Sequence, residues 1–380
     1  MPVEAGSTRR SLNRRLTRTL ALQGEEQVRS YETRNTLSAD WSESAGLDPK
    51  KNNNTVRAFV VGEDFAGMHA QALGLAERAG WAGTFHPVAL NSAARLAMSY
   101  APAWARQVLL QKWGKTALLP CLQSFKQADP AVIISVGGKG GVVGAALRAQ
   151  HCPVVQVQHP RQDISRFDLV IACQHDNLRG KNVLVGRTAV HGLTPARLEA
   201  ARLVWAPRWH ALPRPLIGVL LGGSNGRYRF TPKEAHKLGQ ILLNTCRTEG
   251  GSLMVTSSRR TPPAVCAILS HYIYQVGGMF WHGEGENPYT GLIACADRLL
   301  VTMDSVSMVS EAVAGTAPVV VFPFSVGRSR RITNFLHALQ QTRRIRVIDA
   351  TERTLPQPWH VQPLDDTPAL IAEMHQKLGF

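Results

Sequence analysis

A polar loop follows a short apolar strand late in the chain and opens a helix. The strand is Arg298 to Thr302, and the loop carries Asp304, Ser305, Ser307 and Ser310. Because the first turn of a helix presents unpaired N–H groups and a positive dipole end, such a loop is typical of a site for an anion, above all phosphate. The alternative is that these side chains only cap the helix, although four polar side chains exceed what one cap needs.

Two further loops in the same half of the chain suit phosphate. Glycines let backbone N–H groups approach phosphate closely, and an arginine fork matches its oxygens. One loop follows an apolar strand at 216–221, and the other follows a strand at 252–256. Simple strand-to-helix turns and solvated arginines are the alternatives. The residues of interest are Gly222, Gly223, Ser224, Asn225, Arg259 and Arg260.

Two other positions of this half admit two interpretations each. The turn at Asn287 and Tyr289 either places an aromatic ring against a nucleotide base or is only a turn. Glu311 lies just inside the helix that the polar loop opens, where it either contacts a ligand or pairs with a nearby arginine.

The elements that must position these loops alternate between strands and helices. An apolar strand at 56–61 is followed by a loop and a helical pattern from His69 to Ala79, and a second strand at 131–136 precedes a loop at 137–141. Later apolar segments repeat the alternation, which is typical of parallel sheets with helical crossovers. The predicted fold class is α/β, with two Rossmann-like doubly wound domains facing a cleft.

The domain limits follow from composition. Residues 1–54 are predicted to be a basic flexible extension, and 55–205 a first Rossmann-like domain on the acceptor and membrane side. After proline-rich residues 206–215, a second domain is predicted for 206–350, with 351–380 as a tail or helix that packs back.

Composition limits the partners. The chain has 380 residues, 44% of them hydrophobic, and a formal net charge of +16, so an acidic partner is expected. Nucleotide phosphates, anionic lipid and nucleic acid all qualify, but no nucleic-acid module appears, so no specific nucleic-acid partner is predicted. The 6 cysteines show no paired spacing, which indicates reduced core residues and a cytosolic compartment. The sequence has no GxGxxG loop followed by an acidic residue about 20 positions later, so a dinucleotide-dependent oxidoreductase is disfavoured.

Two segments suit a membrane surface. Arginines and leucines between Arg9 and Leu20 are compatible with a basic amphipathic helix or with a disordered tail. The segment from Ala93 to Phe125 combines Trp104, Trp113 and several cations without an acidic residue. It is predicted to be either an interfacial helix or a pair of ordinary helices with a basic face. No run of 18 apolar residues indicates a spanning helix.

The loops as a set resemble the mitochondrial-fission "elongated mitochondria" family of plants and bacteria, over about Val56 to Asp349. The chain departs from that family at Glu63-Asp64-Phe65, where an acidic-glycine-arginine start is common, and at the glycine-rich loop at 137–141. The motifs that carry the resemblance are Ala66-Gly67, Gln71 to Ala76, His159 to Arg161, Phe167 to Val170, His175 to Asn177, Leu221 to Asn225, Ser257 to Pro262, Glu286 to Tyr289 and Asp304 to Ala312.

That family is in turn similar to GT-B glycosyltransferases, whose C-terminal half binds a nucleotide sugar. The resemblance implies that Gly222 to Asn225 lie near the diphosphate, with Arg259 or Arg260 adding charge. It implies that Ser305, Ser307 and Met308 line the phosphate loop and that Glu311 accepts from a ribose hydroxyl. It also implies an alternative function, a non-enzymatic membrane scaffold that recruits a dynamin-like partner.

The leading hypothesis is a metal-independent transferase that moves a sugar from a nucleotide-diphosphate sugar to a membrane-associated acceptor, with no cofactor. No DxD metal motif is present. An inverting reaction needs a base from the first domain, for which Asp64 is preferred and His69 is second. His159 and Arg161 are expected on the acceptor side. The predicted location is cytoplasmic, peripheral on the inner face of an anionic membrane.

Overall fold

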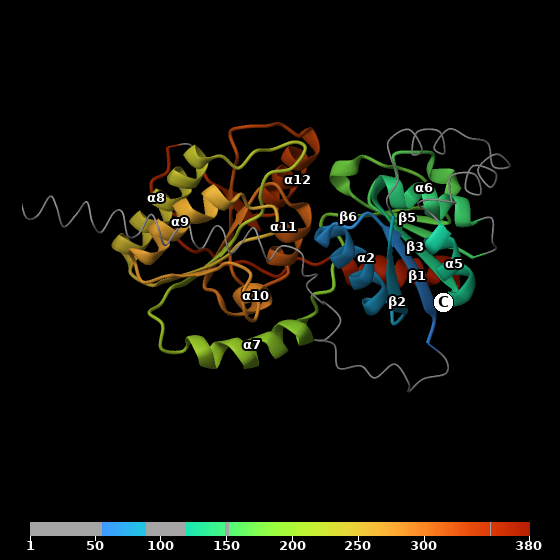
Figure 1. The fold of residues 1–380 in the computed structure, drawn as a ribbon, viewed down its shortest axis with the longest axis horizontal. Helices are drawn as coiled ribbons and strands as arrows, with labels where there is room; N and C mark the ends of the chain where they lie inside the picture. The colour runs from blue at the N-terminus through green and yellow to red at the C-terminus, as the bar shows by residue number, and fades with distance from the viewer. Residues whose placement is uncertain (1–54, 89–118, 149–151, 350) are drawn as a thin grey trace, which may run out of the picture. The chain divides into compact units, whose positions relative to one another are not determined.

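A computed structural model of the chain describes residues 55–88, 119–148, 152–349 and 351–380. They contain two sheets of 6 strands each, and all neighbouring strands in both sheets run parallel. Figure 1 shows the strands of each sheet with helices packed around them. The predicted α/β class with two doubly wound halves is confirmed.

The first sheet is buried on both faces. Ala58 and Val60 of β1 (Arg57–Gly62) point to one face, which α2 (Ala66–Arg78) and α13 (Thr367–Leu378) cover. Phe59 and Val61 point to the other face, which α5 (Leu119–Ala128) and α6 (Gly137–Leu147) cover. In spatial order the strands are β2 (Ala82–Pro87), β1 (Arg57–Gly62), β3 (Val132–Val136), β4 (Val154–Val157), β5 (Leu169–Cys173) and β6 (Val183–Gly186).

The second sheet has one large core of its own. Its strands, in spatial order, are β12 (Ile345–Val347), β11 (Val319–Phe322), β10 (Arg298–Thr302), β7 (Leu216–Leu220), β8 (Ser252–Thr256) and β9 (Met279–Trp281). Its helices are α7 (Pro195–Trp209), α8 (Pro232–Glu249), α9 (Pro263–Tyr274), α10 (Tyr289–Cys295), α11 (Val306–Val313) and α12 (Arg330–Gln341).

Strand order places a topological switch point in each sheet. In the first sheet β2 lies on one side of β1, and the chain then crosses to β3 on the other side of β1. In the second, β7 leads outward through β8 and β9, and β10 begins the opposite direction. Ligands of open α/β sheets bind outside the carboxyl ends of the strands at such points. The loops after β1, β7 and β10 are therefore the positions where a site is expected.

The glycine-rich stretch after β3 is a helix, and the prediction of a loop at 137–141 is wrong. The first residue of α6 is Gly137, directly after the strand. A Cβ at Gly140 would lie 2.6 Å from the carbonyl oxygen of Val61, so the missing side chain allows α6 to pack tightly on β1. Lys139 forms an ion pair with Glu63 at 2.9 Å.

Several expectations remain predictions. The domain limits are untested, although α7 runs through residue 205 and three residues of α13, Leu370, Ile371 and Met374, lie in the core of the first sheet. The extension at 1–54 and most of the segment at 93–125 lie outside the described residues. Among the helices in the described ranges, none combines the length and apolar character needed to cross a bilayer. The free thiols include Cys152, Cys173, Cys246, Cys266 and Cys295.

Candidate active site

Asp304 is the buried centre of the loops at the second switch point. Its side chain is fully buried and accepts hydrogen bonds from the backbone N–H of Gly223 at 3.0 Å and from the Thr302 hydroxyl at 2.8 Å. Arg260 adds an ion pair at 2.9 Å. Burial raises the pKa of this carboxyl, and Arg260 opposes the shift. Asp304 thus ties three loops together, and its carboxylate faces protein groups, contrary to the prediction of a ligand-facing side chain.

The loop Gly222 to Asn225 has no free backbone donor. The four N–H groups donate in order to Thr302 Oγ1, Asp304 Oδ2, the Arg260 carbonyl and the Tyr228 carbonyl. A Cβ at Gly223 would collide with the Arg260 carbonyl, so this glycine serves the close approach of two loops. The sequence-based expectation was that the glycines leave backbone N–H groups free to bind phosphate. In this structure those N–H groups are bonded within the protein. Their place near a diphosphate stays a prediction.

The side chains of Ser224 and Asn225 have structural partners. Ser224 Oγ accepts from the N–H of Phe230 at 3.1 Å. The Asn225 oxygen accepts from two backbone N–H groups of the following turn, and its nitrogen donates to the carbonyl of Asp304. Both residues stabilise the turn after β7.

The two arginines after β8 differ. Arg260 is held by Asp304, whereas the exposed Arg259 makes no hydrogen bond or ion pair with the part of the chain that the structure describes. The positive charge of Arg259 nevertheless reaches His69 of α2, where it contributes to a lowered pKa. Arg259 is the cation of this pair that remains for an anionic ligand.

The start of α11 follows the capping alternative. Ser305 is the N-cap, and its hydroxyl accepts from the N–H of Met308 at 3.3 Å. Ser307 accepts a hydrogen bond of 2.5 Å from the side-chain amide of Gln71. Ser310 is buried and accepts from the N–H of Ala189 at 2.9 Å. Of these side chains, Ser307 and Ser310 join α11 to the elements of the first sheet, and their prediction as part of a phosphate loop is not tested.

The half-buried Tyr289 and the buried Glu311 form a hydrogen-bonded pair. The Tyr289 hydroxyl donates a short hydrogen bond to Glu311 Oε2. Burial raises the pKa of Glu311 to about 7, while the hydrogen bond from Tyr289 opposes the shift. Burial and the charge of Glu311 raise the pKa of Tyr289 as well. Asn287 accepts from the N–H of Tyr289 at 3.0 Å and is exposed, so the turn alternative holds for Asn287.

The first switch point brings together the two predicted base residues. His69 Nε2 lies 3.1 Å from Asp64 Oδ1, an ion-pair contact without hydrogen-bond alignment. The imidazole stacks on Phe85 with ring centroids 3.5 Å apart. Burial lowers the pKa of His69, Asp64 raises it, and Arg259 lowers it. A neutral imidazole beside a carboxylate is suited to accept a proton.

The predicted acceptor residues lie after β4. His159 Nδ1 accepts from the N–H of Arg161 at 3.0 Å. Gln158 and Arg161 have positive φ angles of 68° and 59°, a strained conformation for side chains of this kind. Burial first, and then the charge of Arg161, lowers the pKa of His159.

Side chains that give no signal in the sequence connect these loops. Gln158 donates to Gln71 at 3.1 Å, and Gln71 donates to Ser307, so a chain of amides links β4, α2 and α11. Arg331 of α12 forms an ion pair with the buried Asp176 that follows β5. An isolated glutamine or arginine gives no signal in the sequence, because its importance depends on a partner far along the chain, 87 positions away for Gln158 and Gln71 and 155 for Arg331 and Asp176.

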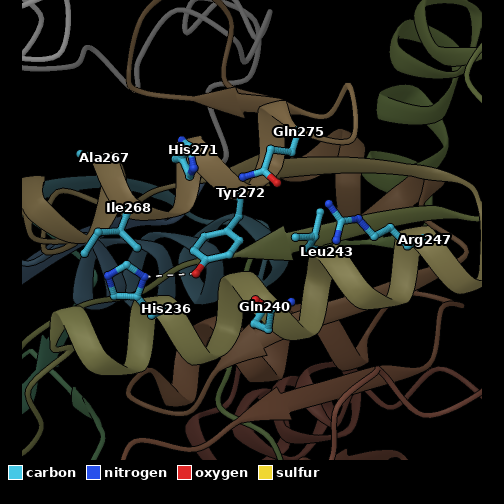
Figure 2. Close-up of a pocket in the computed structure, with 9 residues that line it drawn as sticks. All are labelled: His236, Gln240, Leu243, Arg247, Ala267, Ile268, His271, Tyr272 and Gln275. Carbon is cyan, nitrogen blue, oxygen red and sulfur yellow. Dashed lines mark hydrogen bonds between the residues drawn. The ribbon is translucent and has the colours of Figure 1, made fainter. Parts of the chain in front are cut away.

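A surface groove of about 650 Å³ lies elsewhere, between α8 and α9. Figure 2 shows His236 and Tyr272 joined by a hydrogen bond, with Gln240 of α8 near Tyr272 and Arg247 further along the same helix. The distance from His236 Nδ1 to the Tyr272 hydroxyl is 3.2 Å. None of the predicted site residues lines this groove, so its volume does not identify the candidate active site. Within the described ranges, no three metal-ligating side chains gather into a site for an ion.

Two parallel six-stranded sheets, each with a switch point, define a fold of the GT-B type. The rice protein Os79, solved in complex with UDP, superposes with a TM-score of 0.50 over 84% of this chain and 91% of its own, at 11% identity. The glycosyltransferase SnogD from Streptomyces nogalater gives a TM-score of 0.48 over 86% of this chain and 96% of its own, at 12% identity. At such identities the likeness concerns the fold alone.

The chain belongs to the family described as mitochondrial fission ELM1, whose model matches residues 66–378. This confirms the resemblance inferred from the loops. The mitochondrial fission protein ELM1 of Arabidopsis thaliana is 28% identical over 287 residues. The match spans 68% of this chain and 66% of the plant protein, slightly under two thirds of its length.

Proposed function

We propose that this protein transfers a sugar from a nucleoside-diphosphate sugar to an acceptor hydroxyl at a membrane surface. The observation that carries the proposal is the contact of His69 with Asp64 at the first switch point, within the field of Arg259 from the second sheet. The UDP bound by Os79 and the shared GT-B-like fold support a nucleotide sugar as the partner.

In the proposed reaction, His69 is the base and Asp64 orients it, which reverses the order preferred from sequence. The acceptor oxygen attacks the anomeric carbon of the donor and forms the new glycosidic bond. The bond from that carbon to the diphosphate breaks, and the diphosphate leaves with the electron pair. The acceptor proton passes to His69, and the carboxylate of Asp64 stabilises the resulting imidazolium. Burial lowers the pKa of the imidazole, which favours the neutral form that a base requires.

The leaving diphosphate needs positive charge. Arg259 is exposed and without a hydrogen bond or ion pair among the described residues, so we assign it to the diphosphate. Glu311 Oε2 accepts the hydrogen bond of the Tyr289 hydroxyl. In the proposal, Oε1 accepts a hydrogen bond from a ribose hydroxyl of the donor. No step is assigned to a metal ion or to a cofactor.

A direct test is a melting-temperature screen with UDP-, GDP-, ADP- and CMP-linked sugars, followed by an assay of nucleotide release. The variants His69→Gln and Asp64→Asn should lower kcat, His69→Gln by at least 100-fold, with little change in donor affinity. Arg259→Gln should weaken donor binding, and Arg247→Gln, an exposed arginine in the groove on α8, is the matched control. The proposal fails if no nucleotide sugar binds at millimolar concentration.

The net charge of +16 supports a peripheral location on the inner, anionic face of a membrane. Flotation with vesicles containing phosphatidylserine tests this, and binding that is insensitive to salt would contradict it. If no nucleotide sugar binds while the vesicles do, the scaffold function with a dynamin-like partner replaces the enzyme.

A further inference from the structure

Helix α7 packs on the second half of the chain through one apolar face. Leu198, Trp205 and Trp209 of this helix contact the core of the second sheet. A Cβ at Gly291 of α10 would lie 2.4 Å from Cγ of Trp205, so the two helices touch closely at this point. Figure 1 shows α7 beside α10, at the edge of the second half. These contacts determine which side of α7 faces outward.

The outward face of α7 is apolar as well. Ala196, Ala200, Leu203 and Pro207 follow one another at intervals of four, three and four residues, which places them on one face of the helix. All four residues are exposed, and the exposed fraction of Leu203 is 71%. Val204 lies next to them and is 43% exposed. The outer face of a surface helix is normally polar, so this stripe is typical of an interface.

The charged side chains beside the stripe are neutralised within the chain. The three arginines of α7 each form an ion pair with a carboxylate, and the guanidinium of Arg208 also lies 4.6 Å from the centroid of the Trp205 ring. The pairs are Arg197 with Glu77, Arg202 with Glu199 and Arg208 with Glu286. A helix that binds an anionic membrane surface needs its cations for the lipid head groups. The outward face of α7 is therefore suited to an apolar protein surface.

The stripe runs from small to large side chains, which suits a second copy of the same helix. Two antiparallel α7 helices, related by a twofold axis between positions 200 and 203, place Leu203 of each copy against Ala200 of the other. The same axis places Pro207 against Ala196. Because a large side chain meets a small one at each contact, the helices can approach to the usual distance of about 8–10 Å. A parallel arrangement sets alanine against alanine and leucine against leucine, which packs less well.

We propose that the outward face of α7 is the surface through which two copies of this chain associate, with their α7 helices antiparallel. Two chains of net charge +16 repel each other, and the repulsion is smallest at a face whose arginines are paired. The stripe from Ala196 to Pro207 is about 16 Å long, so the contact is small and the association is weak and concentration-dependent. The association does not depend on sugar transfer.

Sedimentation velocity of the full chain, at concentrations up to several hundred micromolar, tests the association. Leu203→Asp places a carboxylate in the apolar contact and should weaken the association by about tenfold or more. The position is exposed, so the melting temperature should not change. Val326→Asp is the matched control, since Val326 is an exposed apolar residue, 42% accessible, on a loop of the second half. A wild-type chain that stays monomeric throughout, or an equal effect of the two variants, would overturn the proposal.

Disulfide cross-linking tests the antiparallel order. A mixture of Ala200→Cys and Leu203→Cys chains should form linked pairs faster than either variant alone, above the background of the wild-type chain. Faster linking within each separate variant contradicts the antiparallel arrangement. Flotation with vesicles containing phosphatidylserine tests the rival partner. If Leu203→Asp lowers vesicle binding while the wild-type chain stays monomeric, the face binds lipid and the proposal is wrong.

Discussion

The hydroxyl of Tyr289, at the start of α10, donates its hydrogen bond to the carboxylate of Glu311 on α11. The two residues lie in different segments of the second half. Glu311 raises the pKa of Tyr289, and the hydrogen bond from Tyr289 lowers the pKa of Glu311. The predicted contacts of the Tyr289 ring with a base and of Glu311 with a ribose therefore compete with, or share, an interaction that already exists within the protein.

Glu311 should make stability depend on pH. Burial raises its pKa from 4.5 to about 7, so the folded state binds the proton more tightly than the unfolded chain. This contribution is complete below pH 4.5 and is lost as the pH rises through about 7. The loss is on the order of 3 kcal/mol. Denaturant unfolding of Glu311→Gln against wild type at several pH values should show the variant gaining relative stability with rising pH. The exposed Glu373→Gln should not, and parallel curves for Glu311→Gln would contradict the prediction.

Removing the hydroxyl of Tyr289, which donates to Glu311, should lower stability at high pH, where Glu311→Gln should raise it. In Tyr289→Phe the carboxyl of Glu311 loses the hydrogen bond that favours its ionised form, so its pKa should rise above its present value. We expect the free energy of unfolding at pH 8 to fall by about 1.5–3 kcal/mol. Thermal unfolding at pH 5 and pH 8 checks this, and equal losses at both values would count against a charged acceptor.

Asp304→Asn should destabilise the loops at the second switch point. The amide cannot replace a carboxylate that accepts from Gly223 and Thr302 and pairs with Arg260. Asp304 is buried but Arg260 is 38% exposed, so solvent screens the ion pair, and we expect a loss of about 2–3 kcal/mol, mainly from the two hydrogen bonds, which urea unfolding measures. Arg260→Met should cost a comparable amount, since it strands the buried carboxylate. A loss below about 1 kcal/mol in both variants would show that the pair is not needed for stability.

Arg344 should be needed for folding without any role in a ligand site. Its buried guanidinium donates to three carbonyls at and just after the end of α11, those of Val313, Ala317 and Gly315, at 3.0, 3.0 and 2.7 Å. Arg344→Leu leaves all three unsatisfied and should lower the unfolding free energy by roughly 3 kcal/mol. The control is Arg247→Leu at an exposed position. If the melting temperatures of the two variants agree, the carbonyls have found other donors.

The fold was predictable because strands that are buried on both faces have continuous apolar sequences. The segments at 131–136 and 216–221 each correspond to a strand, within one residue at either end. The edge strand β2 has a half-exposed pattern, AGTFHP, that lacks this signal. Glycines at 137–141 indicated a loop for the same reason that they suit a tightly packed helix: the absence of a side chain.

The site was predictable only in position. The apolar runs predicted the strands that precede these loops, and the loops after β1, β7 and β10 lie where parallel strands end, at the switch points. The partners of each polar atom were not predictable. Ser307 meets Gln71 from 236 positions away, and Asp304 meets Gly223 from 81 positions away. Local spacing contains no information about such pairs.

The hydrogen bonding of the loop Gly222 to Asn225 bears on the entropy of ligand association. All four N–H groups of this loop are engaged by the protein itself, and Gly223 is wedged against the Arg260 carbonyl. Because this loop is already ordered in the folded protein, a ligand that binds beside it does not have to order its backbone. The entropy of ordering the loop is lost on folding and not on binding. The loop acts as a preorganised wall, and the freedom lost on binding falls on arginine side chains.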